Sequence, residues 1–262
     1  MLQSLTSLSD NGAMGAGFSP SLPTLSDLDA AFNLAPISTI STKLSEAEER
    51  EIQWKKERWG KLTASNFGKL FGAGRSKSQP FSKTAMDYIE QIAAQCVTEF
   101  NLEDEFFSRA TENGKQREAG TIQDFAERLG VSPYMTGQAQ EFFVSACGAY
   151  GGTPDGMIDV DAGIEAKSPK YSTHVRYLSR VKTQDDLLNE CPDYFWQCVG
   201  GMELTNRDKW YWVSGHRMMK EGRHKVHYVE VRRDERDIAK LRERLEMAID
   251  YRNQILKSIG AI

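Results

Sequence analysis

The sequence has few cysteines, and none of them has the spacing of a metal or redox site. Its four cysteines are Cys96, Cys147, Cys191 and Cys198, and they form neither a C-x-x-C pair nor a zinc-finger pattern. Isolated cysteines of this kind are typical of reduced thiols in a cytoplasmic protein. The pattern therefore gives no support to a Cys–His metal site.

The chain also lacks a long apolar run. No stretch approaches the roughly 18 to 20 consecutive apolar residues of a membrane-spanning helix. Residues 1–16 have no basic region followed by an apolar region, so no secretory signal peptide is predicted. With 262 residues, of which 40% are hydrophobic, the chain can still bury a sizeable core. We expect a cytoplasmic protein that does not bind a membrane.

A strong net charge is absent as well. The formal net charge is −4, and residues 1–47 hold one lysine and four acidic residues, which leaves the remainder near neutrality. This balance argues against a surface coated in positive charge. Any contact with nucleic acid must come from a local basic patch, and a cluster of acids elsewhere could bind a metal.

Residues 1–43 differ in composition from the rest of the chain. They are rich in Ser, Gly, Pro and Leu and contain no Trp or Tyr, which predicts a flexible N-terminal arm. A short amphipathic helix around residues 24–32 could dock on the body or on a partner. The Ser-x-x-Glu capping box at residues 45–48 then opens the folded domain, which we expect to span 44–262.

The rest of the chain begins with helices and continues with short strands and further helices. The predicted helices span residues 45–59, 82–100, 109–129 and 235–256, with a two-turn helix starting at 63–65 and another starting at 192. The predicted strands span residues 141–145, 157–160, 164–167, 209–213 and 224–232. A basic flexible loop is expected at 72–77 and a tight turn at 161–163. The chain has no internal repeat, and this order predicts one domain of the α/β class with α+β character.

The most informative motif is a pair of carboxylates and a lysine in a predicted hairpin. Asp155 lies in the turn-rich segment Gly151–Gly156, and Glu165 and Lys167 lie in the returning strand. The two-residue period of a strand puts Glu165 and Lys167 on one face and directs Ala166 the other way, into packing. Two carboxylates can hold a hard divalent cation, and a lysine can act on a water beside it. The alternative is an exposed hairpin whose charges are simply solvated.

A two-metal site needs a third acid and further polar groups. Glu118, on a helix before the strands, is the candidate acid; the alternative is a solvated carboxylate paired with a neighbouring Lys or Arg. Gln197 could point into the same cleft, or be an ordinary polar helix residue. Positive charge from metal ions would lower the pKa of Lys167 and help it orient or deprotonate water. A plain ion pair between Lys167 and Glu165 would need no such role.

Five short motifs, in the same order, resemble one nuclease family. They are Arg58–Ser65, Gly114–Glu118, Gly152–Gly156, Glu165–Pro169 and Tyr194–Gln197. The set is similar to the lambda exonuclease or YqaJ-like branch of the PD-(D/E)xK nucleases, a phage family, over about residues 58–211. The resemblance implies a PD-(D/E)xK restriction-endonuclease-like core, in which helices flank a central mixed sheet. It also implies an Mg²⁺-dependent 5′-to-3′ exonuclease that degrades one strand of linear duplex DNA and leaves a 3′ single strand.

The resemblance assigns roles to the acids and their neighbours. Glu118, Asp155, Glu165 and the backbone carbonyl of Ala166 would bind two Mg²⁺ ions, for which Mn²⁺ could substitute. The implied catalytic residues are Lys167, which would activate water, Gln197, which would support the site, Glu165 and Asp155.

The resemblance also implies a site for a DNA end. Arg58 and Ser65, with Thr63 beside them, would bind the 5′-terminal phosphate, since a guanidinium is a bidentate phosphate donor and a serine at a helix start adds a hydroxyl. The structural alternatives are a helix C-terminal cation for Arg58 and an N-cap for Ser65. Arg75 and Lys77 could contact the duplex backbone, or belong to a solvated loop.

Members of this family that act processively form rings, so the resemblance implies a homo-oligomer with a single-strand annealing protein as partner. Residues 1–43 are additional to the family domain and could dock that partner. Two alternatives remain open. A structure-specific or site-specific endonuclease on the same fold would cut closed circular DNA. A non-catalytic DNA-binding protein is less consistent with the intact acids and lysine, and an iron–sulfur nuclease would need more clustered cysteines.

Overall fold

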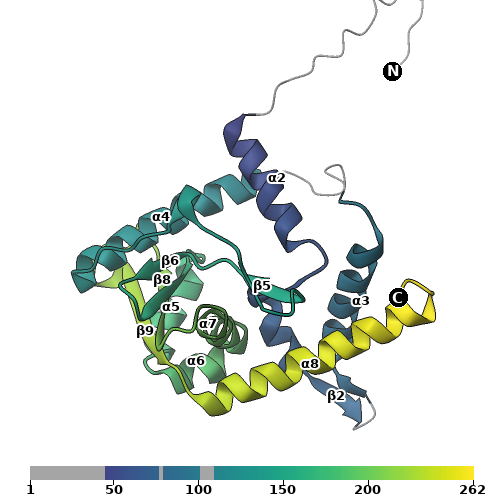
Figure 1. The fold of residues 1–262 in the computed structure, drawn as a ribbon. Helices are drawn as coiled ribbons and strands as arrows, with labels where there is room; N and C mark the ends of the chain where they lie inside the picture. The colour runs from purple at the N-terminus through teal and green to yellow at the C-terminus, as the bar shows by residue number, and fades with distance from the viewer. Residues whose placement is uncertain (1–44, 77–78, 101–108) are drawn as a thin grey trace, which may run out of the picture. The chain divides into compact units, whose positions relative to one another are not determined.

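The computed structural model describes residues 45–76, 79–100 and 109–262, and a four-stranded mixed sheet forms its centre (Figure 1). The strands lie in the order β6-β7-β8-β9, with bounds Gly156–Ile158, Ala162–Lys167, Lys209–Gly215 and Val226–Arg232. β7 and β8 are parallel, whereas the other neighbours are antiparallel. The predicted α/β class with a mixed sheet flanked by helices is confirmed.

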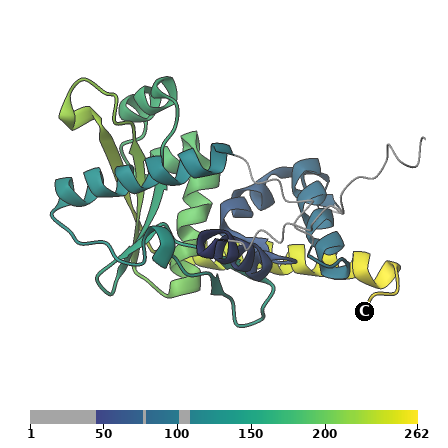
Figure 2. The ribbon, with the colours of Figure 1, turned by 90° about the horizontal axis from the view of Figure 1, so that it is seen from above.

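Helices cover both faces of this sheet, as Figure 2 shows. α4 (Arg109–Leu129) packs on one face, where Phe125 contacts the rings of Tyr211 and Tyr228. α7 (Pro192–Thr205) packs on the other face, against Trp210 and Trp212. This division follows the alternation along β8, whose odd and even residues belong to separate core clusters. The connection from β7 to β8 also includes α5 (Tyr171–Arg180) and α6 (Gln184–Glu190).

The contact between α7 and the sheet depends on two glycines. A Cβ on Gly163 in β7 would lie 2.4 Å from the Trp210 indole, and a Cβ on Gly201 in α7 would lie 2.5 Å from it. Both distances are too short for real atoms. Glycine at these positions therefore makes room for the indole between β7 and α7.

The remaining elements complete the described part of the domain around the central sheet. The helical elements are α2 (Glu46–Arg58), η1 (Ala64–Phe71), α3 (Lys83–Val97), η2 (Gly137–Ala139), η3 (Gly222–His224) and α8 (Glu235–Ser258). The strands are β1 (Leu62–Thr63), β2 (Ala73–Ser76), β3 (Gln79–Phe81), β4 (Phe143–Val144) and β5 (Tyr150–Gly152). β5 pairs with both β1 and β4, and α8 packs along α3 and η1. The Arg244 guanidinium of α8 donates to the carbonyl oxygens of Leu70 and Pro80, which fixes α8 to this region.

Several helix boundaries follow from local chemistry. Ser82 caps α3 by accepting a hydrogen bond from the Ala85 amide, and Thr183 forms a capping box with Asp186 at the start of α6. Gly130 follows α4 with a φ of 71°, the left-handed conformation expected of a residue that ends a helix.

The structure corrects the predictions in four places. Residues 73–76 form strand β2, paired with β3, instead of a flexible loop. The hairpin turn lies at 159–161, not 161–163, because Asp159 adopts a φ of 45° and β7 already begins at Ala162. The helix near residue 63 is a 3₁₀ helix that starts at Ala64, so Ser65 lies inside it and is not its N-cap. Several elements were not predicted at all, namely α5, α6, the short strands β1, β3 and β5, and the 3₁₀ helices η2 and η3.

The predicted arm at residues 1–43 and its short helix lie outside the described residues. Among the helices that are described, none combines the length and the hydrophobicity needed to cross a bilayer.

Candidate active site

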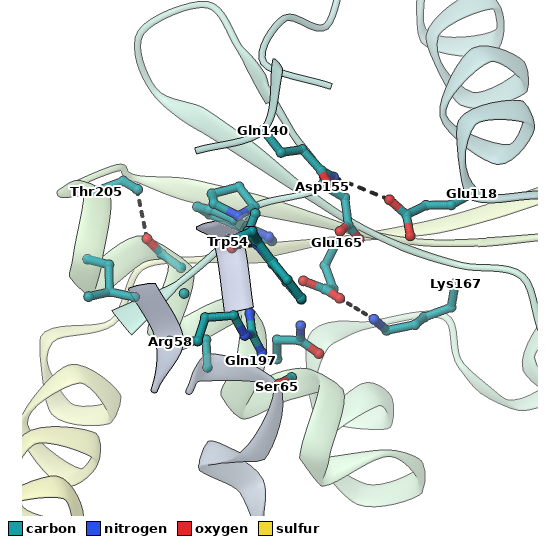
Figure 3. Close-up of a pocket in the computed structure, with 17 residues that line it drawn as sticks. Trp54, Arg58, Ser65, Glu118, Gln140, Asp155, Glu165, Lys167, Gln197 and Thr205 are labelled. Carbon is teal, nitrogen blue, oxygen red and sulfur yellow. Dashed lines mark hydrogen bonds and ion pairs between the residues drawn. The ribbon is translucent and has the colours of Figure 1, made fainter. Parts of the chain in front are cut away.

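One pocket brings together most of the residues that the sequence predicts for the site (Figure 3). Its cavity volume is about 220 Å³. The predicted residues that line it are Arg58, Ser65, Glu118, Asp155, Glu165, Lys167 and Gln197. They come from α2, η1, α4, the turn before β6, β7 and α7, so the pocket forms only when these elements have packed together.

The acidic hairpin forms the floor of the pocket. The Asp155 amide donates to the Ile164 carbonyl at 3.1 Å, and the Ala166 amide donates to Asp155 Oδ2 at 2.7 Å. These bonds hold the Asp155 carboxylate beside β7. Glu165 and Lys167 lie on one face of β7 and form an ion pair, as the two-residue period predicts. The Ala166 side chain packs on the opposite side of the sheet, also as predicted.

The surroundings of the two carboxyl groups of the hairpin disfavour their charged forms. Glu165 is only 2% exposed. Its burial, together with the neighbouring charge of Asp155, raises the pKa of Glu165 to about 8, although Lys167 opposes this shift. Burial also raises the pKa of Asp155, and the Lys167 charge opposes it. The hairpin is therefore a site where additional positive charge would be strongly stabilising.

The acids of the hairpin govern the pKa of Lys167 when no cation is bound. Burial by itself would lower the pKa of the Lys167 ammonium, but the charges of Glu165 and Asp155 outweigh it and raise this pKa. The Lys167 Nζ also lies 5.4 Å from the centre of the Tyr194 ring, and Tyr194 in turn stacks on Trp212. These contacts hold the ammonium at the pocket wall.

Glu118 reaches the pocket from α4. Gln140 Nε2 donates to Glu118 Oε1 at 3.3 Å, and the charge of Glu118 contributes to the raised pKa of Glu165. Figure 3 shows Glu118 and Gln140 beside Asp155. The structure therefore brings the predicted third acid to the first two.

The donors in the pocket suit a hard divalent cation. Carboxylate oxygens are preferred ligands of Mg²⁺, and three acids here share a single lysine. Repulsion between Asp155 and Glu165 is the electrostatic situation that a bound cation relieves. Within the described ranges, no three His, Cys, Asp or Glu side chains already have the arrangement of an assembled metal cluster. Binding would accordingly require small side-chain movements, such as release of Glu165 from Lys167.

A basic side chain forms the opposite wall of the pocket. Arg58 is the last residue of α2, so it also has the helix C-terminal position that the sequence offered as its structural alternative. Its guanidinium lies 4.2 Å from the centre of the Trp54 ring and 5.8 Å from that of Phe142. Trp54 Nε1 donates to Thr153 Oγ1 at 2.9 Å. Arg58 is thus supported by aromatic rings, one of which is bonded to the turn that leads to Asp155.

The hydroxyls near η1 have different positions. Ser65 lines the pocket, and its Oγ lies 3.4 Å from Thr63 Oγ1. Thr63 is 6% exposed, and its amide donates to Tyr88 Oη at 2.8 Å, so this amide is already used within the fold. Asn66 Nδ2 also donates to Thr63 Oγ1, at 2.9 Å. Thr63 therefore supports Ser65 from behind and does not line the pocket.

The two predicted basic contacts to duplex DNA cannot be assigned to this site. Lys77 lies outside the described residues, and only the backbone of Arg75, in β2, is described.

Several residues of the pocket were not predicted for the site. Among them are Trp54, Gln140, Thr153 and Thr205. Trp54 precedes Arg58 by four residues, so the helix period could have placed it on the same face. Thr153 lies within a recognised motif but was given no role. Gln140 lies in an irregular segment before β4 and has no periodic pattern that could reveal it.

Comparison with known proteins gives one family match and several structural matches. The model of the YqaJ-like viral recombinase domain family matches residues 53–208. Curated protein sequences give no match.

The structural matches share the fold at low sequence identity. The alkaline exonuclease LHK-Exo from Laribacter hongkongensis matches with a TM-score of 0.62 and 20% identity, over 79% of this chain and 95% of that chain. LHK-Exo in complex with dAMP matches with a TM-score of 0.64 and 18% identity, over the same shares, 79% and 95%. A phage-related exonuclease from Haemophilus somnus 129PT matches with a TM-score of 0.60 and 17% identity, over 76% of this chain and 96% of that chain. The predicted PD-(D/E)xK-like fold is thereby confirmed.

Proposed function

The chain belongs to the YqaJ-like viral recombinase domain family, as its motifs predict, and we propose that this nuclease is a 5′-to-3′ exonuclease acting on double-stranded DNA ends. It would depend on Mg²⁺, degrade the strand that carries a 5′-phosphate, and leave a 3′ single-stranded tail for recombination by annealing. The similar structures are named as exonucleases, and one of them binds the mononucleotide dAMP. A mononucleotide is the product that this proposal requires.

One observation supports the proposal above all others. A single pocket holds the acidic hairpin on one side and Arg58 with Ser65 on the other. An endonuclease and an exonuclease both need the acids, but an anion-binding wall a short distance away suits a strand that ends there with a phosphate. A 5′-terminal phosphate bound by Arg58 and Ser65 would direct the adjoining phosphodiester toward Asp155 and Glu165.

In this proposal Asp155, Glu165, Glu118 and the carbonyl of Ala166 hold two Mg²⁺ ions. When bound, such ions polarise the scissile phosphate and lower the pKa of water. Asp155 keeps its orientation through the Ala166 amide, and Gln140 orients Glu118. These bonds fix the donors before the substrate arrives.

Lys167 and Gln197 would act on the water and on the phosphate. The Lys167 ammonium pairs with Glu165 and is a hydrogen-bond donor. With Glu165 engaged in holding a cation, Lys167 would orient the attacking water or bind a phosphate oxygen. The Gln197 amide lines the same pocket and can hold that water in place.

The decisive experiment follows the digestion of linear duplexes that differ only in one 5′ end. The wild-type protein with Mg²⁺ is expected to release mononucleotides from a 5′-phosphorylated strand faster than from a 5′-hydroxyl strand. Arg58→Ala should abolish this preference. Arg50→Ala is the matched control, because Arg50 lies on the same helix and bonds Gln138 outside the pocket.

Three outcomes would contradict the proposal. Equal rates on both ends would remove the role of Arg58. Cutting of a closed circular plasmid would indicate the structure-specific or site-specific endonuclease instead. Full activity in EDTA would contradict the dependence on a divalent metal. Mn²⁺ is expected to support activity in place of Mg²⁺.

The proposal extends to assembly and location. By analogy with the family, we expect a homo-oligomeric ring, a single-strand annealing protein as partner, and action in a bacterial cytoplasm where the DNA lies. Light scattering of the full chain tests the ring, since a monomeric mass would contradict it. Co-purification with and without residues 1–43 tests whether the arm binds the annealing partner.

A further inference from the structure

A second groove opens beside the active site, and none of its residues belongs to the pocket described above. The Tyr171 groove, as we name it, has a volume of about 540 Å³. It lies between α5 and the connection from β8 to β9, which Figure 2 shows side by side. Its lining includes Tyr171, Val175, His216, Met218 and Lys220, together with the acid Glu221.

The groove exposes apolar and aromatic surface to an unusual degree. Tyr171 is 69% exposed, Val175 47% and Met218 85%. The Tyr171 and His216 rings are nearly perpendicular, with an interplanar angle of 83° and ring centres 6.3 Å apart. The high exposure of Tyr171 leaves much of its phenol accessible to a planar partner.

The groove lies at the same end of the sheet as the catalytic lysine. β7 and β8 are parallel, and Lys167 is in register with Ser214. The two strands therefore leave the sheet together, so the segment 168–171 and the segment 216–220 emerge side by side next to Lys167. Tyr171 follows Lys167 by only four residues of chain.

The segments around the groove are strongly basic, in contrast to the net charge of −4 of the chain. Residues 167–184 contain no acid, and their basic residues are Lys167, Lys170, Arg176, Arg180 and Lys182. Residues 216–227 contain one acid, Glu221, and their basic residues are Arg217, Lys220, Arg223 and Lys225.

Part of this charge is available to a ligand. Arg217 pairs with Asp124 and Arg223 with Glu221. In the described part of the chain, Lys170 and Lys220 have no acidic partner within salt-bridge distance, and both are exposed.

We infer that the Tyr171 groove binds single-stranded DNA beside the active site, with one base stacked on Tyr171 and the backbone held by Lys170 and Lys220. An exposed aromatic ring among lysines is the combination that single-strand binding surfaces use. Inside a duplex the faces of the bases are covered by stacking, whereas a strand separated at the active site exposes them to Tyr171. This inference rests on the proposed nuclease function, because it is the unwound strand that the groove would receive.

The test measures binding without cleavage. The full-length protein in EDTA at low salt is titrated into a short fluorescent oligodeoxythymidylate, and the dissociation constant is taken from fluorescence anisotropy. Tyr171→Leu is expected to weaken binding by about tenfold, the size of effect that loss of one base stack gives. Tyr171→Phe keeps the ring and should bind nearly as the wild type does.

Matched variants test the charge and the position. Lys220→Ala should weaken binding and reduce its salt dependence, whereas Lys257→Ala, an exposed lysine near the end of α8, should not. Photo-crosslinking of an oligonucleotide containing 5-iodouracil should label the peptide that includes Tyr171. Circular dichroism of each variant confirms folding.

Unchanged binding by Tyr171→Leu, or no binding of the oligonucleotide by the wild type, would overturn the inference. The inference would also fail if Tyr171→Leu lost binding to a protein partner but still bound the oligonucleotide, because the groove would then be a protein interface. The outcomes remain separable from the proposed function. Wild-type protein that binds the oligonucleotide through Tyr171 but digests no duplex would contradict the exonuclease proposal alone.

Discussion

Trp54 Nε1 donates a 2.9 Å hydrogen bond to Thr153 Oγ1, and this bond joins α2 to the turn that leads to Asp155. The same indole lies under the Arg58 guanidinium, 4.2 Å from its central carbon. Trp54 therefore couples the position of Arg58 to the position of the acidic hairpin.

Trp54→Phe keeps a ring beneath Arg58 but removes the donor to Thr153. We expect the preference for a 5′-phosphate over a 5′-hydroxyl to fall by roughly 2- to 10-fold, the value of one hydrogen bond of about 0.5–1.5 kcal/mol. Initial rates on the two duplexes measure this ratio. Trp59→Phe is the control, because Trp59 Nε1 donates to the Thr98 carbonyl at 3.1 Å, away from the pocket. Equal effects of the two variants would refute the coupling.

Asp155→Asn removes a charge while keeping an oxygen that can accept from the Ala166 amide. Cleavage should fall by more than about 100-fold, since loss of groups that merely support a metal ligand already costs roughly 10–100-fold. The folded protein should be no less stable, because burial already disfavours the charged carboxylate. Digestion rates and thermal unfolding of the same samples give both values. Asp159→Asn, in the exposed turn of the hairpin, should leave both nearly unchanged.

Gly163→Ala should destabilise the domain by about 1–3 kcal/mol, the usual cost of overpacking a core. The new Cβ would lie 2.4 Å from the Trp210 indole, which is 1% exposed and has little space to move. Urea unfolding measures the change in free energy. Gly222→Ala serves as the control, because a Cβ at Gly222 would meet no atom within 4 Å. A loss of stability as large at Gly222 would contradict the packing explanation.

His174 should make the domain less stable as the pH falls below about 6.5. Burial lowers the pKa of His174 in the folded chain, where its ring contacts Ser214 Oγ at 2.8 Å and the His224 carbonyl at 2.7 Å. The unfolded chain keeps the usual pKa of about 6.5 and takes up the proton first, so the stabilisation is complete above that pH and is lost as the pH falls toward the folded pKa.

The contribution of His174 is the difference in the pH dependence of stability between the wild type and a His174 variant. Glu165 contributes with the opposite sign, because its folded pKa of about 8 favours the folded state at low pH and the contribution is lost as the pH rises. Urea unfolding at pH 7.5 and pH 5.5 should therefore show that acidification changes the stability of His174→Asn more favourably than that of the wild type. Identical changes in the two proteins would show that His174 does not contribute.

The acidic hairpin could be predicted because its chemistry lies in one short stretch of sequence. Asp155, Glu165 and Lys167 are close along the chain, and strand alternation already gives their relative faces. α4 and α8 could also be predicted, since both have long amphipathic patterns. The central sheet followed from its β-branched and aromatic strands.

Other parts of the fold have no comparable local pattern. α6 has only seven residues, too few for a clear period. β2 contains Gly74 and the basic residue Arg75, yet it becomes a strand by pairing with β3, and local propensity does not include the stability gained from that pairing. Arg58 and the acidic hairpin line the same pocket because of tertiary packing. In the sequence, only the order of the motifs indicates that they lie close together. The sign of the pKa shift of Lys167 likewise depends on which charges surround it in three dimensions.

The parallel pairing of β7 with β8 has a consequence for when the site can exist during synthesis. β7, which carries Glu165 and Lys167, is an interior strand, and its parallel neighbour begins 42 residues after β7 ends, at Lys209. A hairpin of β6 and β7 alone is at best marginally stable in water. A ribosome-bound or truncated chain that stops before β8 therefore has the proposed catalytic residues but no assembled acidic site, so nuclease activity should arise only late in translation.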